Sequence, residues 1–182
     1  MTDDTERRLL LQIARDTIVA HASGADAPTA DRTDLGGRRG GAFVTLHKRT
    51  ELRGCIGHIE ADQTLVRVVA RCAVAASSTD PRFPAVSPAE IAELSIELSL
   101  LGPLEPIAGP DEVQIGTHGL VVEKGWHRGL LLPQVATEWK WDACQFFEQT
   151  CRKAGLPHDA WKQDAKIWRF EAEVFGEDSS VS

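Results

Sequence analysis

Two segments of this chain have the pattern of β-hairpins, and they limit the folds that the chain can adopt. Residues 41–47 and 51–59 are rich in strand-forming side chains and flank a short polar turn. Residues 119–123 and 128–132 repeat this arrangement around a turn that contains a glycine. Two-residue to five-residue turns join antiparallel strands, whereas parallel strands need a long crossover. A largely antiparallel sheet is therefore expected.

Helices are expected outside these hairpins, where apolar side chains recur every three or four residues. The predicted helices cover about residues 5–23, 64–77, 133–138 and 141–155, and further strands cover residues 94–100 and 167–175. A short helix is also predicted after Ser87, because Ser87-Pro88-Ala89-Glu90 has the residues of a capping box. Strands and helices do not alternate regularly, so we predict an α+β fold in which helices cover a mixed, largely antiparallel sheet.

Residues 24–41 are rich in glycine, alanine, aspartate and arginine and contain a proline. This composition predicts a long surface connection. Loops of this length are uncommon in compact domains unless they are functional or act as spacers. We expect either a flap over a site or a mobile spacer.

The charge and the cysteine pattern exclude several classes of function. A formal net charge of -7 over 182 residues argues against nonspecific binding to nucleic acid. The four cysteines lack the spacing of a zinc site or a thioredoxin motif, so neither a metal nor a cofactor is expected. Three of them, Cys72, Cys144 and Cys151, lie on apolar helix faces and are expected in the core. No apolar run reaches membrane-spanning length, and we predict a cytoplasmic protein with free thiols.

The fourth cysteine, Cys55, has the surroundings that a reactive thiol needs. Gly54 and Gly57 leave little side-chain bulk around its sulfur. In a regular strand Arg53 would lie on the same face and would favour the thiolate, whereas His58 would lie on the other face as a surface residue. The alternative is that the thiol packs beneath a helix and that the two glycines permit tight backbone packing.

A nucleophilic cysteine needs a base from elsewhere in the fold, and His118, in a glycine-flanked turn, is the candidate. His118 has the alternative role of a turn residue that bonds its own backbone. Glu138 could orient the histidine or contact a ligand amine, or it could be a helix-surface carboxylate. Asp80 and Arg82 are expected to lock a proline turn, although an arginine at a cleft rim could also hold an anionic substrate.

Several motifs together resemble the AMMECR (AMME-syndrome chromosomal region) domain family, whose prokaryotic members are called AmmeMemoRadiSam system protein A. In chain order the motifs are Leu52-Arg53-Gly54-Cys55-Ile56-Gly57, Asp80-Pro81-Arg82-Phe83-Pro84, Gly116-Thr117-His118-Gly119-Leu120, Leu132-Pro133-Gln134-Val135-Ala136 with Glu138, Trp141-Asp142, and Lys153-Ala154-Gly155-Leu156-Pro157. The acidic residues at the C-terminus predict a disordered tail at 177–182. The resemblance implies one domain over residues 5–176, in two closely packed sub-lobes. It also implies a cleft near the signature strand and association with Memo-like and radical-SAM-like proteins.

Three functions remain open at this stage. The first is a cysteine-dependent enzyme that acts on a small polar metabolite, with Cys55 and His118 as catalytic residues and Arg53, Arg82, Gln134 and Glu138 as substrate-binding residues. The second is a non-catalytic ligand-binding or adaptor module. The third is a regulator linked to nucleic acid, in which some of the five tryptophans stack on bases, although core packing is the expected role of most of them.

Overall fold

The computed structural model describes residues 2–25 and 37–177. The chain divides into two compact units, one formed by Met1–Leu101 with Glu173–Ser182 and the other by Gly102–Ala172. We call them unit 1 and unit 2. Most of the predicted 24–41 connection, residues 26–36, lies outside the described residues.

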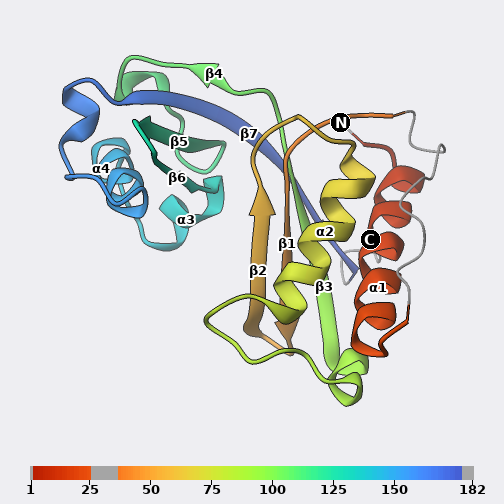
Figure 1. The fold of residues 1–182 in the computed structure, drawn as a ribbon. Coiled ribbons are helices and arrows are strands. Elements are labelled where there is room, and N and C mark those ends of the chain that lie inside the picture. The colour runs from red at the N-terminus through yellow and green to blue at the C-terminus, as the bar shows by residue number, and fades with distance from the viewer. Residues whose placement is uncertain (1, 26–36, 178–182) are drawn as a thin grey trace. The chain divides into compact units, whose positions relative to one another are not determined.

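Unit 1 consists of a sheet with two helices on one face (Figure 1). The helices are α1 (Asp4–Ala22) and α2 (Leu65–Ser78). The strands are β1 (Ala42–Lys48), β2 (Glu51–His58) and β3 (Leu94–Leu101), followed by the last residues of β7 (Lys166–Gly176). Their order is β2-β1-β3-β7, and β1 is antiparallel to both of its neighbours. The strand β2 therefore lies at an edge.

Alternation along the strands separates the two faces of this sheet. In β3, Ile96, Leu98 and Leu100 are buried in the core beneath α1 and α2, whereas Ser95, Glu97 and Ser99 point to the other face. The apolar stripe of α2 supplies the other side of this core. The face without helices is consequently more polar than the core face.

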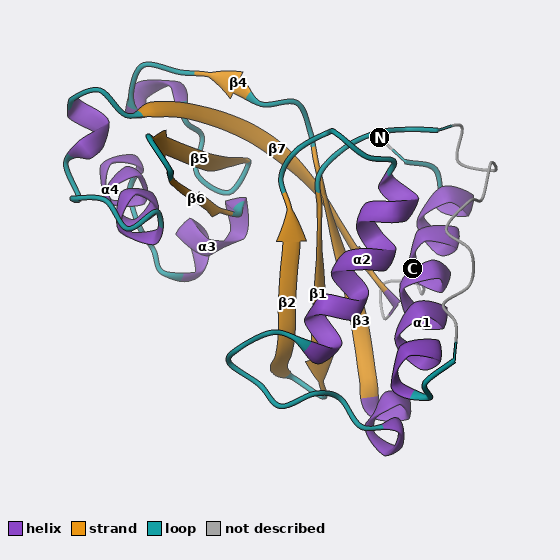
Figure 2. Cartoon of the chain, in the orientation of Figure 1, coloured by secondary structure: helices purple, strands orange, loops and turns teal. Residues whose placement is uncertain are grey.

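Unit 2 contains a second antiparallel arrangement of strands with short helices (Figure 2). Its strands are β4 (Glu105–Pro106), β5 (His118–Lys124), β6 (His127–Leu131) and the first part of β7, in which β5 lies between β6 and β7 and β4 pairs with β7. Its helices are α3 (Pro133–Glu138) and α4 (Ala143–Lys153), with 3-10 turns η3 (Pro110–Glu112) and η4 (Ala160–Lys162). The predicted α+β class is confirmed.

The helix predicted after Ser87 is present, but as the 3-10 helix η2 (Pro88–Glu93). Both bonds of its capping box are formed, between Ser87 and Glu90.

Cys72 and Cys151 are buried as predicted, but the prediction for Cys144 is wrong, since its side chain is exposed. The buried stripe of α4 runs through Phe146, Phe147 and Cys151. Cys144 lies at the margin of this stripe in the first turn of the helix, where the core no longer covers it.

None of the five tryptophans is fully buried, so core packing accounts for fewer of them than expected. Trp126 and Trp139 are exposed, and Trp139 stacks on Trp141 with ring centroids 5.9 Å apart. Trp141 and Trp161 pack against the core of unit 2. A role in nucleic-acid binding stays a prediction.

The described chain continues one residue beyond β7, to Glu177, which is the first residue of the predicted tail. Glu177 accepts hydrogen bonds from the Arg15 guanidinium and from the backbone N–H of Ile96 at 2.8 Å. Order in unit 1 therefore extends through Glu177, and the rest of the predicted tail, residues 178–182, lies outside the described residues. Over residues 2–25 and 37–177, no helix combines the length and apolar character needed to cross a membrane.

Candidate functional site

The strand β2 is irregular immediately before Cys55. Leu46 of β1 pairs with Gly54 and the next residue, His47, pairs with Leu52, so Arg53 is the extra residue of a β-bulge. The expectation that Arg53 and Cys55 lie side by side assumed regular alternation, and the bulge breaks that alternation.

The guanidinium of Arg53 is engaged by other groups. It donates hydrogen bonds to the carboxylate of Glu90 at 3.2 and 3.3 Å and to the carbonyl of Pro84 at 2.9 Å. Hydrogen bonds from the Ser87 backbone and from Arg53 lower the pKa of Glu90 to about 2. Arg53 thus joins the edge strand to the capping box of η2 instead of contacting the thiol.

The two glycines around Cys55 are required for close packing. A Cβ atom on Gly54 would lie 2.2 Å from the carbonyl oxygen of Ala76 in α2. A Cβ atom on Gly57 would lie 2.4 Å from the ring of Phe43. The packing role proposed for these glycines is therefore present, and it does not bury the thiol, because Cys55 stays partly exposed.

The backbone of Cys55 is held on both sides by the turn that follows α2. Its N–H donates to a carboxylate oxygen of Asp80 at 2.9 Å, and its carbonyl accepts from the guanidinium of Arg82 at 3.2 Å. Arg82 in turn donates to both oxygens of Asp80, at 3.0 and 2.7 Å. The predicted lock between Asp80 and Arg82 is confirmed, and it also closes the open edge of β2.

Electrostatics strengthen this lock. Asp80 is buried, yet hydrogen bonds from Arg82 and from the Cys55 amide hold the pKa of its carboxyl well below the usual range. The hydrogen bonds to Asp80 are the main reason that the pKa of the Arg82 guanidinium is raised. Arg82, and not Arg53, is consequently the cation that contacts Cys55, through the carbonyl oxygen of its backbone.

The thiol itself receives one hydrogen bond, which sequence reasoning missed. The hydroxyl of Thr45 donates to the sulfur of Cys55 at 3.3 Å. These residues face each other in the register of β1 and β2, and Thr45 also faces Glu97 across β1 and β3. A thiol, a hydroxyl and a carboxylate therefore form one cross-strand row on the face without helices.

The neighbouring row on this face is formed by Gly57, Phe43 and Ser99. Ser99 is fully buried, and its hydroxyl oxygen has no hydrogen-bond partner among residues 2–25 and 37–177. We call the set of Thr45, Cys55, Glu97 and Ser99 the polar face. Strand alternation reveals which residues point away from the core, but the sequence does not show which of them lie opposite one another.

The other predicted site residues belong to unit 2. His118, at the start of β5, accepts a hydrogen bond at Nδ1 from the backbone N–H of Gln114 at 3.0 Å. A neutral imidazole that accepts at Nδ1 carries its proton on Nε2, so Nε2 is a donor and the Nδ1 lone pair is already engaged. This bond matches the alternative role of His118 as a turn residue. Gln134 is half-buried and Glu138 is exposed, both in α3. The predicted cleft that would combine these residues with Cys55 stays a prediction.

His58, expected at the surface, is half-buried and has two acidic neighbours. Its Nε2 lies 2.6 Å from Asp62, and its Nδ1 lies 3.6 Å from Glu60. The hydrogen bond to His58 lowers the pKa of Asp62. These contacts hold the connection between β2 and α2.

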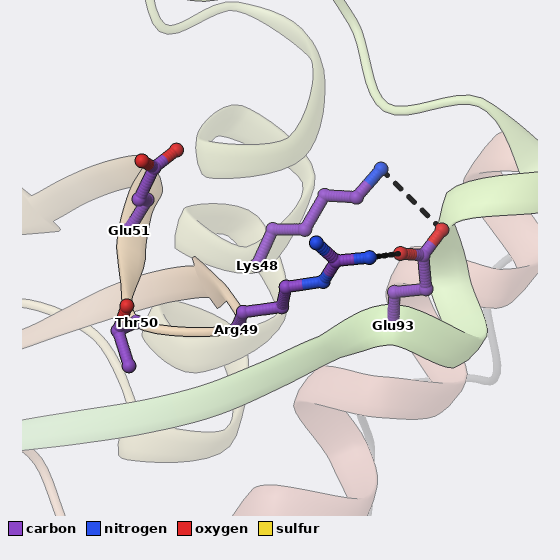
Figure 3. Close-up of a pocket in the computed structure, with 5 residues that line it drawn as sticks. All are labelled: Lys48, Arg49, Thr50, Glu51 and Glu93. Carbon is purple, nitrogen blue, oxygen red and sulfur yellow. Dashed lines mark ion pairs between the residues drawn. The ribbon is translucent and has the colours of Figure 1, made fainter.

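A hollow of about 370 Å³ lies at the turn between β1 and β2 (Figure 3). It is lined by Lys48, Arg49, Thr50, Glu51 and Glu93. Lys48 and Arg49 both pair with Glu93, at 3.4 and 4.0 Å, so the positive charge of this turn is compensated within the hollow. Among the residues that the structure describes, no three His, Cys, Asp or Glu side chains gather as metal ligands would.

The fold and the signature strand define a class of small α+β domain in which a Gly-Cys-Ile-Gly segment lies on a locked edge strand. The chain belongs to the AMMECR1 family, whose model matches residues 11–175.

Similar proteins are found in archaea. A protein of Methanothermobacter thermautotrophicus is 44% identical over 182 residues, with 95% of each chain covered. Protein TK0174 of Thermococcus kodakarensis is 42% identical over 183 residues, covering 93% of this chain and 89% of the relative. The crystal structure of the uncharacterized protein PH0010 from Pyrococcus horikoshii matches with a TM-score of 0.84 at 38% identity, covering 93% of this chain and 90% of that one. These matches establish family and fold.

Proposed function

We propose that the chain is a ligand-binding module whose polar face holds a small polar molecule, and that it works with Memo-like and radical-SAM-like proteins. The observation that carries this proposal is the row formed by Cys55, Thr45 and Glu97. Its three groups can donate or accept hydrogen bonds, and they project from a sheet whose backbone is fixed.

The lock at Cys55 supports binding because it removes freedom before a ligand arrives. Asp80 and Arg82 hold both backbone polar groups of Cys55, and Thr45 contacts its sulfur. A group that is already ordered loses less conformational entropy when it binds. Binding at this face therefore needs no rearrangement of the strand.

A cysteine-dependent enzyme is the second candidate. A partly exposed thiol favours it. Against it, within the described part of the chain the only hydrogen bond to the sulfur comes from the Thr45 hydroxyl, which is not a base at neutral pH. The His118 imidazole has its Nδ1 lone pair engaged by a backbone donor.

The two candidates differ in what Cys55→Ser does. Purified protein would be incubated with small-molecule extract, washed and examined by mass spectrometry, both intact and after release of bound molecules. The binding module predicts a noncovalent molecule retained by wild type and by Cys55→Ser, and lost or weakened in Thr45→Val. Cys144→Ser is the matched control, because it removes an exposed thiol outside the polar face.

The enzyme predicts a different result. A mass added covalently to Cys55, or turnover that Cys55→Ser abolishes while the variant stays folded, would favour catalysis over binding. Retention of no molecule by any of the proteins would contradict the ligand-binding proposal.

A further inference from the structure

Two groups on the polar face have no hydrogen-bond or ion-pair partner among the described residues. Glu97 is half-buried, and among the described residues its carboxylate makes neither a hydrogen bond nor an ion pair. Ser99, two residues along β3, is fully buried with an unpartnered hydroxyl. Buried polar groups normally find partners, and an unpaired one costs free energy.

A third acceptor lies beside them. The Thr45 hydroxyl donates a hydrogen bond to the Cys55 sulfur, so the lone pairs of the hydroxyl oxygen remain able to accept hydrogen bonds. Thr45 is directly opposite Glu97 in the register, and Cβ atoms of facing residues lie about 5 Å apart. Ser99 points to the same face as Glu97 because the two are separated by one residue.

The two arginines around Cys55 do not supply the missing cation. Arg53 is bound to Glu90, and Arg82 is bound to Asp80. The positive charges closest to the thiol are thus compensated by other carboxylates. Negative charge at Glu97 remains uncompensated within the described residues.

We infer that the polar face binds the primary ammonium group of a small molecule, an inference that rests on the proposed ligand-binding function and specifies its ligand class. An ammonium carries three N–H donors and one positive charge, which match the carboxylate of Glu97 and the hydroxyl oxygens of Thr45 and Ser99. Thr45 and Ser99 are both buried, so the group that reaches them must be slim. An ammonium on a methylene chain meets this requirement better than a planar guanidinium.

The ammonium is tested with n-butylammonium as the probe and with n-butanol and butyrate as neutral and anionic controls of the same length. Amide NMR shifts of Thr45, Glu97 and Ser99 would be followed during titration at pH 7. We expect saturable shifts with n-butylammonium, much weaker shifts with n-butanol and none with butyrate. Equal binding of n-butanol, or no saturable shift with n-butylammonium, would overturn the inference.

A variant of Glu97 tests whether the carboxylate charge contributes to binding. Glu97→Gln keeps the shape and removes the charge, and we expect it to weaken n-butylammonium binding roughly tenfold or more. Glu51→Gln is the matched control, since it removes an exposed carboxylate from the same sheet and should bind as wild type does. Unchanged binding by Glu97→Gln would remove Glu97 from the site.

Ser99→Ala gives a second readout that does not depend on a ligand. It removes a buried, unpaired hydroxyl, so unliganded protein should be equally or more resistant to urea, while n-butylammonium binding falls. A clear loss of stability would show that Ser99 has a structural role instead.

The same spectra distinguish this inference from the proposed function. If a molecule captured from extract shifts the polar face equally in wild type and Glu97→Gln, ligand binding stands and the ammonium assignment fails. If the captured molecule leaves the polar face unshifted in wild type, the proposed function itself fails.

Discussion

The backbone amide of Cys55 donates a hydrogen bond to the buried carboxylate of Asp80 at 2.9 Å. The same carboxylate binds Arg82, and the Arg82 guanidinium donates a hydrogen bond to the carbonyl of Cys55. Two side chains from the turn after α2 thus hold the signature strand at Cys55.

Asp80→Ala should lower the free energy of unfolding by about 3 kcal/mol, because it leaves the edge of β2 unpaired at Cys55. Urea denaturation measures this loss. The matched control is Asp164→Ala, which removes an exposed partner of Lys124 and should change the free energy of unfolding little. Equal losses in the two variants would contradict a structural lock at Asp80.

Gly54→Ala should be strongly destabilising, by about 2 to 3 kcal/mol, because its Cβ would collide with the Ala76 carbonyl in α2. Gly109→Ala is the control, since no atom lies within 4 Å of its added Cβ and its backbone is extended. Thermal or urea unfolding of both variants tests the close approach of β2 and α2. A Gly54→Ala protein as stable as the control would argue against it.

The four thiols should react with iodoacetamide in the order of their exposure. Cys144 should be labelled first, Cys55 more slowly, and Cys72 and Cys151 only after unfolding. Burial raises the pKa of Cys72 to about 11, which further suppresses its thiolate at neutral pH. Peptide mass spectrometry over a time course gives the order, and early labelling of Cys72 would be inconsistent with the packing of α2.

Acid should destabilise the protein through the carboxyls that hold β2 and its turn. The folded-state pKa of Glu90 is about 2, below the ordinary value near 4.5, so its contribution is complete above about pH 5 and is lost as the pH falls toward 2. Asp80 acts with the same sign. Glu90→Gln should therefore reduce the loss of stability between pH 5 and 3.

The control for this pH dependence is Glu105→Gln, because Glu105 pairs with Arg169 at an exposed position. The unfolding free energy of the Glu105→Gln variant should vary with pH as that of the wild type does. A Glu90→Gln profile as steep as that of wild type would show that Glu90 does not contribute.

The sequence was sufficient for features that depend on local chemistry. Periodicity located the helices and hairpins, and the charges of Asp80 and Arg82 around a proline predicted their mutual lock. Cys72 was placed in the core because the apolar stripe of α2 is broad. These features are determined by residues close together in the chain.

Features that depend on register could not be read from the sequence. The bulge at Arg53 arises only when β2 pairs with β1, and it redirects Arg53 to Glu90. The row that joins Thr45 to Glu97 likewise requires the alignment of two strands. Exposure of Cys144 depends on where the core of unit 2 ends, which helical periodicity alone does not show.

The most direct test of the account is an amide NMR map of the protein with the small molecule that it retains from extract. Binding at the polar face predicts shifts centred on Thr45, Cys55 and Glu97, with little change at the hollow lined by Lys48 and Glu93. Shifts centred on that hollow or on the exposed tryptophans would contradict the assignment of the polar face as the ligand site.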